Sequence, residues 1–397
     1  MDTVYNKKAV LSTVFPKKLQ RYFDIEWHRT EITPLWHYLQ QANRTVVLYG
    51  MGNGADKIIE VCRQKGIPVR AVFASDGFVR GQLFHGDRVR SWSEVKAEFG
   101  LESLTVLVSF ATSLPDVLDN ILRIASEAEL FAPDVPVFGN TLFDESFFAE
   151  HRDELEAARA LLSDEESRRI FDLVIQYKLS GDIRPLLEAR NDPAEVMQGL
   201  VRPQNLHTVA DLGAYNGDTV RELLANGASP EKIYALEPDA RNFRKLSEYA
   251  EKETRTQVIP VRGAAWSREE TLLFDASGNR NASAGQNRSA VLEGRPMKTV
   301  EIPALPLDAV LQGQPVDYIK YDVEGSEQEA ITGSAQAIAR HLPTLLVSLY
   351  HRSEDLFAIP LRLKEEFSQY EGYYLRRFGG VPAWDLNLYV TKEKRDG

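Results

Sequence analysis

The feature that most constrains this chain is a strand–turn–helix–strand unit near its middle. An apolar run beginning at Val209 leads into the turn Gly213–Gly217, a helix is predicted over 219–226, and a second strand over 232–236 ends at Glu237. Glycine is favoured where the backbone turns sharply and leaves room for a ligand, and an acidic residue about 20 positions further on is the usual partner of a ribose diol. The unit therefore predicts a parallel α/β sheet that binds an adenosine-like nucleoside, with Glu237 on the ribose.

Two acidic residues in this unit favour one kind of nucleoside over another. Asp211 stands at the mouth of the turn and Asp218 at the start of the helix. A pyrophosphate bound at the helix N-terminus would be repelled by these charges, whereas the sulfonium and ammonium groups of S-adenosylmethionine would be attracted. The alternative is a plain turn in which Asp218 only caps the helix. The residues expected to face the methionine end are Asp211 and, through their backbone amides, Gly213, Ala214, Tyr215 and Asn216; Gly217 is expected to be a further cofactor-binding residue.

Later strands are predicted to bring further side chains to the same edge of the sheet, because ligands lie at the carboxyl ends of parallel strands. A strand over 258–262 leads into Ala264–Trp266, where Ala265 and Trp266 are expected to bind the cofactor, with Trp266 beside the adenine. For Trp266, a place in the core is an equal alternative. Strands over 316–321 and 344–349 lead into Asp322 and His351.

Asp322 and His351 are the candidate catalytic residues. A hydroxyl group is a poor nucleophile at neutral pH, so a base or a metal is expected to take its proton. Together with Glu324, the two side chains also form an oxygen and nitrogen set that suits Mg²⁺ or Mn²⁺. The alternatives are structural: Asp322 caps a helix, and His351 bonds a backbone carbonyl.

The end of the chain indicates the class of sheet. A helix is predicted over 359–370, followed by strands over 372–378 and 386–391. A closing hairpin on a parallel sheet makes one strand antiparallel, which distinguishes a class I methyltransferase from a nicotinamide dehydrogenase domain.

Four segments between about residues 200 and 391 together resemble the FkbM family of S-adenosylmethionine-dependent methyltransferases. They are Asp211–Gly217, Glu237-Pro238, Lys320-x-Asp322-Val323-Glu324-Gly325-x-Glu327 and Tyr350-His351-x-x-x-Asp355-Leu356-x-x-Ile359-Pro360. The third segment is much more specific than the glycine turn, and Tyr215 departs from the small residue that is more usual there. The resemblance implies methyl transfer to an oxygen, commonly a hydroxyl of a sugar, glycan or polyketide.

Residues 1–142 predict a second, Rossmann-like domain. Strands are predicted over 45–49, 69–74, 104–110 and 136–138, with helices over 55–65, 92–99 and 115–126. The turn Gly50–Gly54 departs from the spacing of a dinucleotide site, although Asp76 follows at the distance of a ribose ligand. We predict no hydride-transfer site here; a sugar nucleotide or no ligand at all remain open. Residues 143–200 are predicted to be a helical linker, and 201–397 the methyltransferase domain.

Composition argues against some classes of binding partner. The net charge of −11 and the lack of a long basic run argue against a nucleic acid, and no apolar run has the length of a membrane span. The single cysteine, Cys62, excludes an intrachain disulfide, so a cytoplasmic location is the default expectation. A homo-oligomer is left open. The loop 276–286, rich in Gly, Asn, Ser and Ala, is expected over the substrate.

The predicted fold is thus α/β with two Rossmann-like domains, the C-terminal one a class I methyltransferase sheet. The predicted function is O-methylation of a saccharide, glycan or related polyhydroxyl metabolite. The alternatives are an NAD-linked sugar oxidoreductase and a non-catalytic nucleotide-sensing protein.

Overall fold

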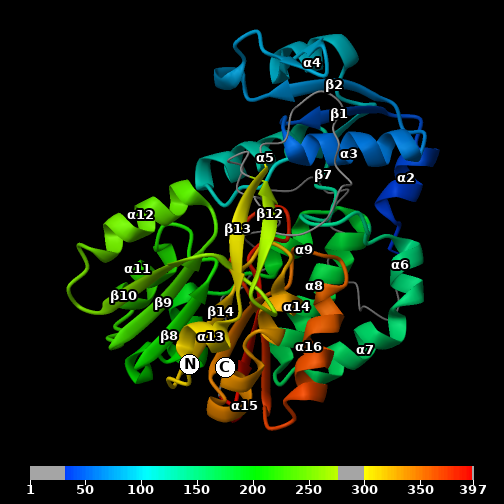
Figure 1. Cartoon of the computed structure of the whole chain (residues 1–397). Helices are drawn as coiled ribbons and strands as arrows, with labels where there is room; N and C mark the ends of the chain where they lie inside the picture. Colours follow the sequence, from blue (N-terminus) through cyan, green and yellow to red (C-terminus); the bar gives the residue numbers. More distant parts are fainter. Residues whose placement is uncertain (1–31, 276–298, 396–397) are drawn as a thin grey trace, which may run out of the picture.

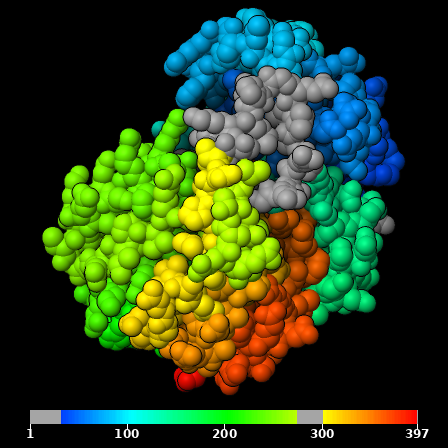
Figure 2. Space-filling model, viewed as in Figure 1, coloured from blue at the N-terminus to red at the C-terminus, as the bar shows by residue number. Residues whose placement is uncertain are grey.

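The computed structural model describes residues 32–275 and 299–395, which form two α/β units (Figure 1). The N-terminal unit, in blue, lies against the upper end of the second unit in the space-filling view (Figure 2). No helix in the described ranges is long and apolar enough to cross a membrane.

The N-terminal unit is built on a parallel sheet with the order β5-β2-β1-β6-β7. Its strands are β1 (Thr45–Tyr49), β2 (Val69–Ala74), β5 (Arg90–Ser91), β6 (Leu104–Val108) and β7 (Glu129–Phe131), beside a short hairpin of β3 (Leu83–Phe84) and β4 (Asp87–Arg88). The helices are α2 (Leu35–Gln41), α3 (Asn53–Gln64), α4 (Trp92–Phe99) and α5 (Pro115–Glu127), with the 3₁₀ turn η2 (Asp76–Phe78). β6 is buried at every position, as expected for a central parallel strand covered on both faces.

The predicted strand over 136–138 is wrong. The outer strand of this sheet is Glu129–Phe131, and the later segment runs as irregular chain. Pro136 has no N–H to continue a ladder. The carbonyls of Pro136 and Val137 instead accept hydrogen bonds from Lys57, each at 2.6 Å.

Between the last strand of the first sheet and the first strand of the second sheet, the chain forms helices. They are α6 (Glu145–Glu150), α7 (Arg152–Leu161), α8 (Glu165–Ser180), α9 (Arg184–Glu188) and α10 (Pro193–Val196), then η3 (Met197–Val201) and η4 (Pro203–Asn205). Leu155 and Val174 belong to the same apolar core as strands of the second sheet. The segment predicted as a linker is therefore packed on the second unit as a layer of helices, although the domain boundaries themselves stay a prediction.

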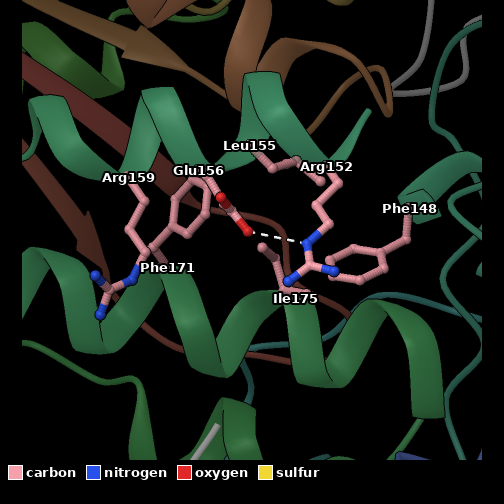
Figure 3. Close-up of a pocket in the computed structure, with 7 residues that line it drawn as sticks. All are labelled: Phe148, Arg152, Leu155, Glu156, Arg159, Phe171 and Ile175. Carbon is pink, nitrogen blue, oxygen red and sulfur yellow. Dashed lines mark hydrogen bonds and ion pairs between the residues drawn. The ribbon is translucent and has the colours of Figure 1, made fainter. Parts of the chain in front are cut away.

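A small groove lies between α7 and α8 (Figure 3). It is lined by Phe148, Arg152, Leu155, Glu156, Arg159, Phe171 and Ile175. Arg152 Nε donates to Glu156 Oε1 at 2.9 Å along α7. None of the predicted site residues lines this groove.

The second sheet has seven strands in the order β10-β9-β8-β14-β15-β17-β16. They are β8 (Thr208–Leu212), β9 (Lys232–Glu237), β10 (Gln257–Arg262), β14 (Tyr318–Tyr321), β15 (Thr344–Ser348), β16 (Gly372–Arg377) and β17 (Leu386–Thr391). β17 is antiparallel to both neighbours, so the predicted closing hairpin is present. The helices are α11 (Asp218–Ala225), α12 (Ala240–Ala250), α13 (Leu307–Leu311), α14 (Glu327–Thr332), α15 (Ala335–His341) and α16 (Asp355–Glu366).

A further three-stranded sheet was not predicted from the sequence. It consists of β11 (Ala264–Ala265), β12 (Glu270–Asp275) and β13 (Thr299–Leu305), and in Figure 1 the β12–β13 ribbon rises toward the N-terminal unit. The loop expected over the substrate, 276–286, falls between β12 and β13 and lies outside the described residues.

Candidate active site

The predicted site residues gather where the order of the second sheet reverses, between β8 and β14. Asp211 on β8 is the register partner of Lys320 on β14. Gly213 follows β8 with a φ of +89°, and a Cβ on it would lie 1.9 Å from the carbonyl oxygen of Asp322. Only glycine fits here, because the ends of the two strands come together at this residue.

Glu237 ends β9 and faces the glycine turn. Its side chain is buried, and its two oxygens accept hydrogen bonds from the backbone N–H of Tyr215 at 2.9 Å and of Asp239 at 2.8 Å. Burial raises the pKa of Glu237 to about 8, against the effect of these two bonds. Each oxygen keeps a lone pair that can accept a further hydrogen bond.

Asp211 is a fully buried carboxylate whose oxygens make no hydrogen bond of good geometry. Burial raises its pKa to about 6, and Lys320, whose Nζ is 3.7 Å from Oδ1, opposes this rise. Buried polar atoms are rarely left without a partner. A cationic ligand group beside Asp211 would supply one.

Lys320 links two of the predicted residues and was not itself predicted as a site residue. Its Nζ donates to Asp322 Oδ2 at 3.3 Å and lies 3.7 Å from Asp211 Oδ1. Burial opposes its charge, but Asp322 and Asp211 raise the pKa of Lys320 above its ordinary value. The only feature of the sequence that could have identified Lys320 as a site residue was its position two residues before Asp322.

Asp322 is held as a carboxylate. Its Oδ1 accepts a hydrogen bond from Tyr350 Oη at 3.0 Å, and its side chain is 30% exposed. Burial raises the pKa of Asp322, but Lys320 and His351 outweigh burial and lower this pKa to about 2. The side chain is therefore ionised at neutral pH and open on one side.

His351 is a buried cation. Its Nδ1 lies 2.8 Å from Glu327 Oε1, and its Nε2 lies 3.5 Å from Glu324 Oε2 and 3.7 Å from Asp322 Oδ1. Burial lowers the pKa of His351, but the surrounding carboxylates, Glu327 above all, outweigh burial and raise it to about 10. A protonated imidazole cannot accept a proton, so these contacts favour a structural role for His351, and its role as a base stays a prediction.

The metal prediction is not supported. In the described part of the chain, no group of three or more His, Cys, Asp and Glu side chains could hold a metal ion. The protonated His351 has no lone pair to offer. Asp322 and Glu324 surround an imidazolium instead, so the positive charge that a metal would supply comes from the protein itself.

Two further buried acids complete this cluster and were not assigned a role from the sequence. Glu327 Oε1 accepts a hydrogen bond from the backbone N–H of Val323 at 3.0 Å, and Asp355 Oδ2 accepts one from that of Arg352 at 3.0 Å. Burial, together with the charge of Glu327, raises the pKa of Asp355. Both residues belong to the quoted motifs, and that membership was the only signal in the sequence.

The predicted cofactor-binding residues Ala265 and Trp266 lie on the small sheet. Ala265 is buried in β11. The indole Nε1 of Trp266 donates to Glu270 Oε1 at 2.6 Å, and its backbone N–H donates to Leu305 O at 3.0 Å. These bonds give Trp266 a structural role. Contact with an adenine stays a prediction.

On the turn itself, Tyr215 has a φ of +46° and an exposed side chain, while Asn216 Oδ1 accepts a hydrogen bond from Arg221 at 3.0 Å. The backbone at Tyr215 is thus in the left-handed region that favours glycine. The Glu237 carboxylate bonded to its N–H holds it there.

The glycine turn of the N-terminal unit has a packing explanation. A Cβ on Gly54 would lie 2.2 Å from Ser109 O, and one on Gly50 would lie 2.4 Å from the ring of Phe110. Asp76 accepts hydrogen bonds from Trp92 N at 2.9 Å and Ser93 Oγ at 3.0 Å. These contacts account for the glycines and for Asp76 without a ligand.

Known proteins resemble this chain in sequence and in fold. Residues 211–375 match the methyltransferase FkbM domain. The crystal structure of methyltransferase FkbM from Methylobacillus flagellatus KT is similar with a TM-score of 0.65 and 17% identity, over 96% of this chain and 98% of that one. A putative methyltransferase from Streptococcus mutans in complex with SAH has 12% identity and a TM-score of 0.31, over 51% of this chain and 98% of that one. No curated protein matches the chain.

The second unit therefore has the fold of a class I methyltransferase, as predicted, with its antiparallel strand near one edge. More particularly, residues 211–375 match the FkbM methyltransferase domain, and this match supports an S-adenosylmethionine-dependent methyltransferase.

Proposed function

We propose that the protein transfers the methyl group of S-adenosylmethionine to a hydroxyl oxygen of a saccharide or related polyhydroxyl metabolite. The observation that carries this proposal is Asp322, an ionised and partly exposed carboxylate at the end of the strand beside the glycine turn. A carboxylate in this place accepts a hydrogen bond from a hydroxyl and so aligns its oxygen with the methyl carbon.

The cofactor residues are proposed from the same geometry. Glu237 would accept hydrogen bonds from both ribose hydroxyls, because each of its oxygens has a lone pair left after bonding the backbone. Asp211, which is buried and makes no hydrogen bond of good geometry, would partner a cationic group at the methionine end. S-adenosylmethionine supplies the activated methyl group when it is bound.

The surroundings of Asp322 fit a neutral polyhydroxyl acceptor. Tyr350, which donates to Asp322, stacks on Trp384 with ring centroids 6.2 Å apart and an angle of 25° between the rings. Aromatic faces pack on the apolar faces of a sugar ring, and carboxylates bind its hydroxyl groups. The carboxylate of Asp322 would repel a phosphate or carboxylate in the same place.

The chemistry needs only a weak base. The acceptor oxygen attacks the methyl carbon, the carbon–oxygen bond forms and the carbon–sulfur bond breaks, with the electron pair going to sulfur. As the new bond forms, the O–H proton becomes strongly acidic. A carboxylate of low pKa such as Asp322 then suffices to take it late in the reaction or to pass it to water. His351 holds Asp322 and Glu324 in place by its charge.

Labelled methyl transfer tests this proposal. The full chain is incubated with S-adenosylmethionine carrying a ¹³C-methyl group and a panel of mono- and oligosaccharides, and the product is identified by NMR. We expect an O-methyl resonance on a sugar carbon bearing oxygen. Transfer only to nitrogen, sulfur or carbon acceptors would contradict the proposal, and calorimetry with NADH tests the oxidoreductase alternative.

Replacing Glu237 by glutamine is expected to weaken binding of S-adenosylhomocysteine by about 10- to 150-fold, the loss of one charge-assisted hydrogen bond of about 1.5–3 kcal/mol. Because burial raises the pKa of Glu237 to about 8, the parent's affinity should rise between about pH 7 and 9 as this carboxyl ionises, and the loss in the variant should be largest at the upper end of this range. Calorimetry across this range measures both effects. The variant should lack the rise that Glu237 causes, whereas Asp239→Asn should keep it; an unchanged affinity in Glu237→Gln would remove Glu237 from the ribose site.

A further inference from the structure

The N-terminal unit reaches the proposed active site through a lysine of its first long helix. Lys57 lies near the start of α3, and its Nζ donates to the carbonyl oxygens of Pro136 and Val137, each at 2.6 Å. These carbonyls begin the irregular segment 136–141, which is here named the strap. One ammonium thus holds two consecutive peptide units of the strap.

The other side of the strap contacts the methyltransferase unit. The backbone N–H of Phe138 donates to the carbonyl of His351 at 2.8 Å, and the carbonyl of Thr141 accepts a hydrogen bond from Ser353 Oγ at 2.6 Å. The ring of Phe138 lies 4.3 Å from the guanidinium carbon of Arg352. The strap is therefore bonded to the segment that follows β15, including the residue that carries the buried imidazolium.

The same phenylalanine packs on the acidic loop 322–327. A Cβ on Gly325 would lie 2.6 Å from the Phe138 ring, and Arg352 Nε donates to the carbonyl of Gly325 at 2.8 Å. Glu324, next to this glycine, has a φ of +53°, an unfavourable backbone conformation for a side chain of its size. Such a conformation persists only where the surroundings hold it, and Phe138 and Arg352 are two of the side chains that contact its neighbour, beside Glu327 of the same loop.

Lys57 and the acidic loop also act on each other electrostatically. Burial lowers the pKa of Lys57 to about 8, and the carboxylate of Glu324 opposes this fall. Glu324 thus faces two cations: the imidazolium of its own unit and the ammonium of the N-terminal unit. Both its backbone and its charge are coupled to the N-terminal unit.

We propose that Lys57 is a positioning residue for methyl transfer: by holding the strap, it fixes the loop 322–327 that carries Asp322 and Glu324. The expected effect of Lys57 on turnover rests on the proposed function, whereas its expected effect on the loop does not. The proposal assigns the N-terminal unit a part in the active site.

Hydrogen–deuterium exchange of the full chain with bound S-adenosylhomocysteine tests the structural step without an acceptor. In Lys57→Met, loss of the two hydrogen bonds is expected to speed exchange in peptides covering the strap and residues 322–327 by about tenfold. Exchange in the turn Gly213–Gly217 should not change. Lys65→Met is the matched control, because Lys65 ends the same helix and pairs with Asp144 at 3.3 Å, outside the strap.

The kinetic step is then measured with any acceptor found by the labelling experiment. Lys57→Met should lower kcat by about tenfold and leave the dissociation constant of S-adenosylhomocysteine within about twofold, while Lys57→Arg, which keeps the charge and the donors, should restore most of the rate. Parental exchange in both segments of Lys57→Met, or an increase spread evenly over the chain, would overturn the proposal. If Lys57→Met does not fold, Lys57→Gln, which keeps a donor, should show an intermediate increase confined to the same segments. Failure to find a sugar acceptor would count against the proposed function alone.

Discussion

Replacing Asp322 by asparagine is expected to lower the rate of methyl transfer by about 10²–10⁴-fold, the usual effect of removing a group that accepts the proton. The amide is neutral, so it neither attracts the developing positive charge on the acceptor oxygen nor takes its proton. Affinity for S-adenosylhomocysteine should stay within about threefold, because the proposed cofactor contacts are made by other residues. Single-turnover kinetics and calorimetry measure the two quantities.

Asp119→Asn is a matched control for this variant. Asp119 is an exposed aspartate on α5, in the N-terminal unit, and its replacement should change neither quantity. Near-parental turnover in Asp322→Asn would leave alignment of the acceptor by other groups as the source of catalysis, and Asp322 would then have a structural role.

His351→Gln is expected to lower the free energy of unfolding by about 3–5 kcal/mol, because removing one partner of a buried ion pair leaves the other charge uncompensated. The charge left behind is that of Glu327, whose Oε1 lies 2.8 Å from Nδ1. Denaturant unfolding monitored by fluorescence measures this loss.

The pH dependence of unfolding identifies the imidazolium. The pKa of His351 is raised from the ordinary 6.5 to about 10, so the folded state binds this proton more tightly than the unfolded state. Its contribution is fully present below about pH 6.5 and is lost as the pH rises toward about 10. The parent should therefore lose stability over this range, and His351→Gln should lack this part of the slope.

His37→Gln serves as the control for the pH series. His37 is exposed on α2, and among the described residues its ring bonds Gln41 at 2.9 Å, one helical turn away, so its replacement should leave the slope unchanged. A parental slope in His351→Gln would mean that His351 is neutral in the folded protein, and its role as a base would then have to be considered again.

Interactions between residues near in sequence were predicted well. The helix over 92–99 was predicted at the limits that the structure shows, because Ser91 and Glu94 form a capping box across one turn. The second sheet was also predicted strand by strand, since apolar runs bounded by turns depend on local pattern. Glu237 was placed correctly at the end of β9 by its distance from the glycine turn.

Features that depend on distant segments were not predicted. The segment 136–138 resembles a short strand, but contacts with Lys57 and His351, far away in the sequence, determine its course. In the small sheet, β12 pairs with β13, and residues 276–298, 23 positions outside the described residues, lie between these two strands. No turn pattern in the sequence therefore predicted the pairing.

The sequence by itself determined the class of fold, the place of the glycine turn and the identity of the acidic motif residues, because these follow from periodicity and spacing along the chain. Only the tertiary structure determined the protonation states of the motif residues. Asp322, Glu324 and His351 come from two loops, and only their packing around one buried imidazole makes the histidine a cation and the aspartate a weak base. Protonation depends on burial and on charges within a few ångströms, and sequence spacing records neither.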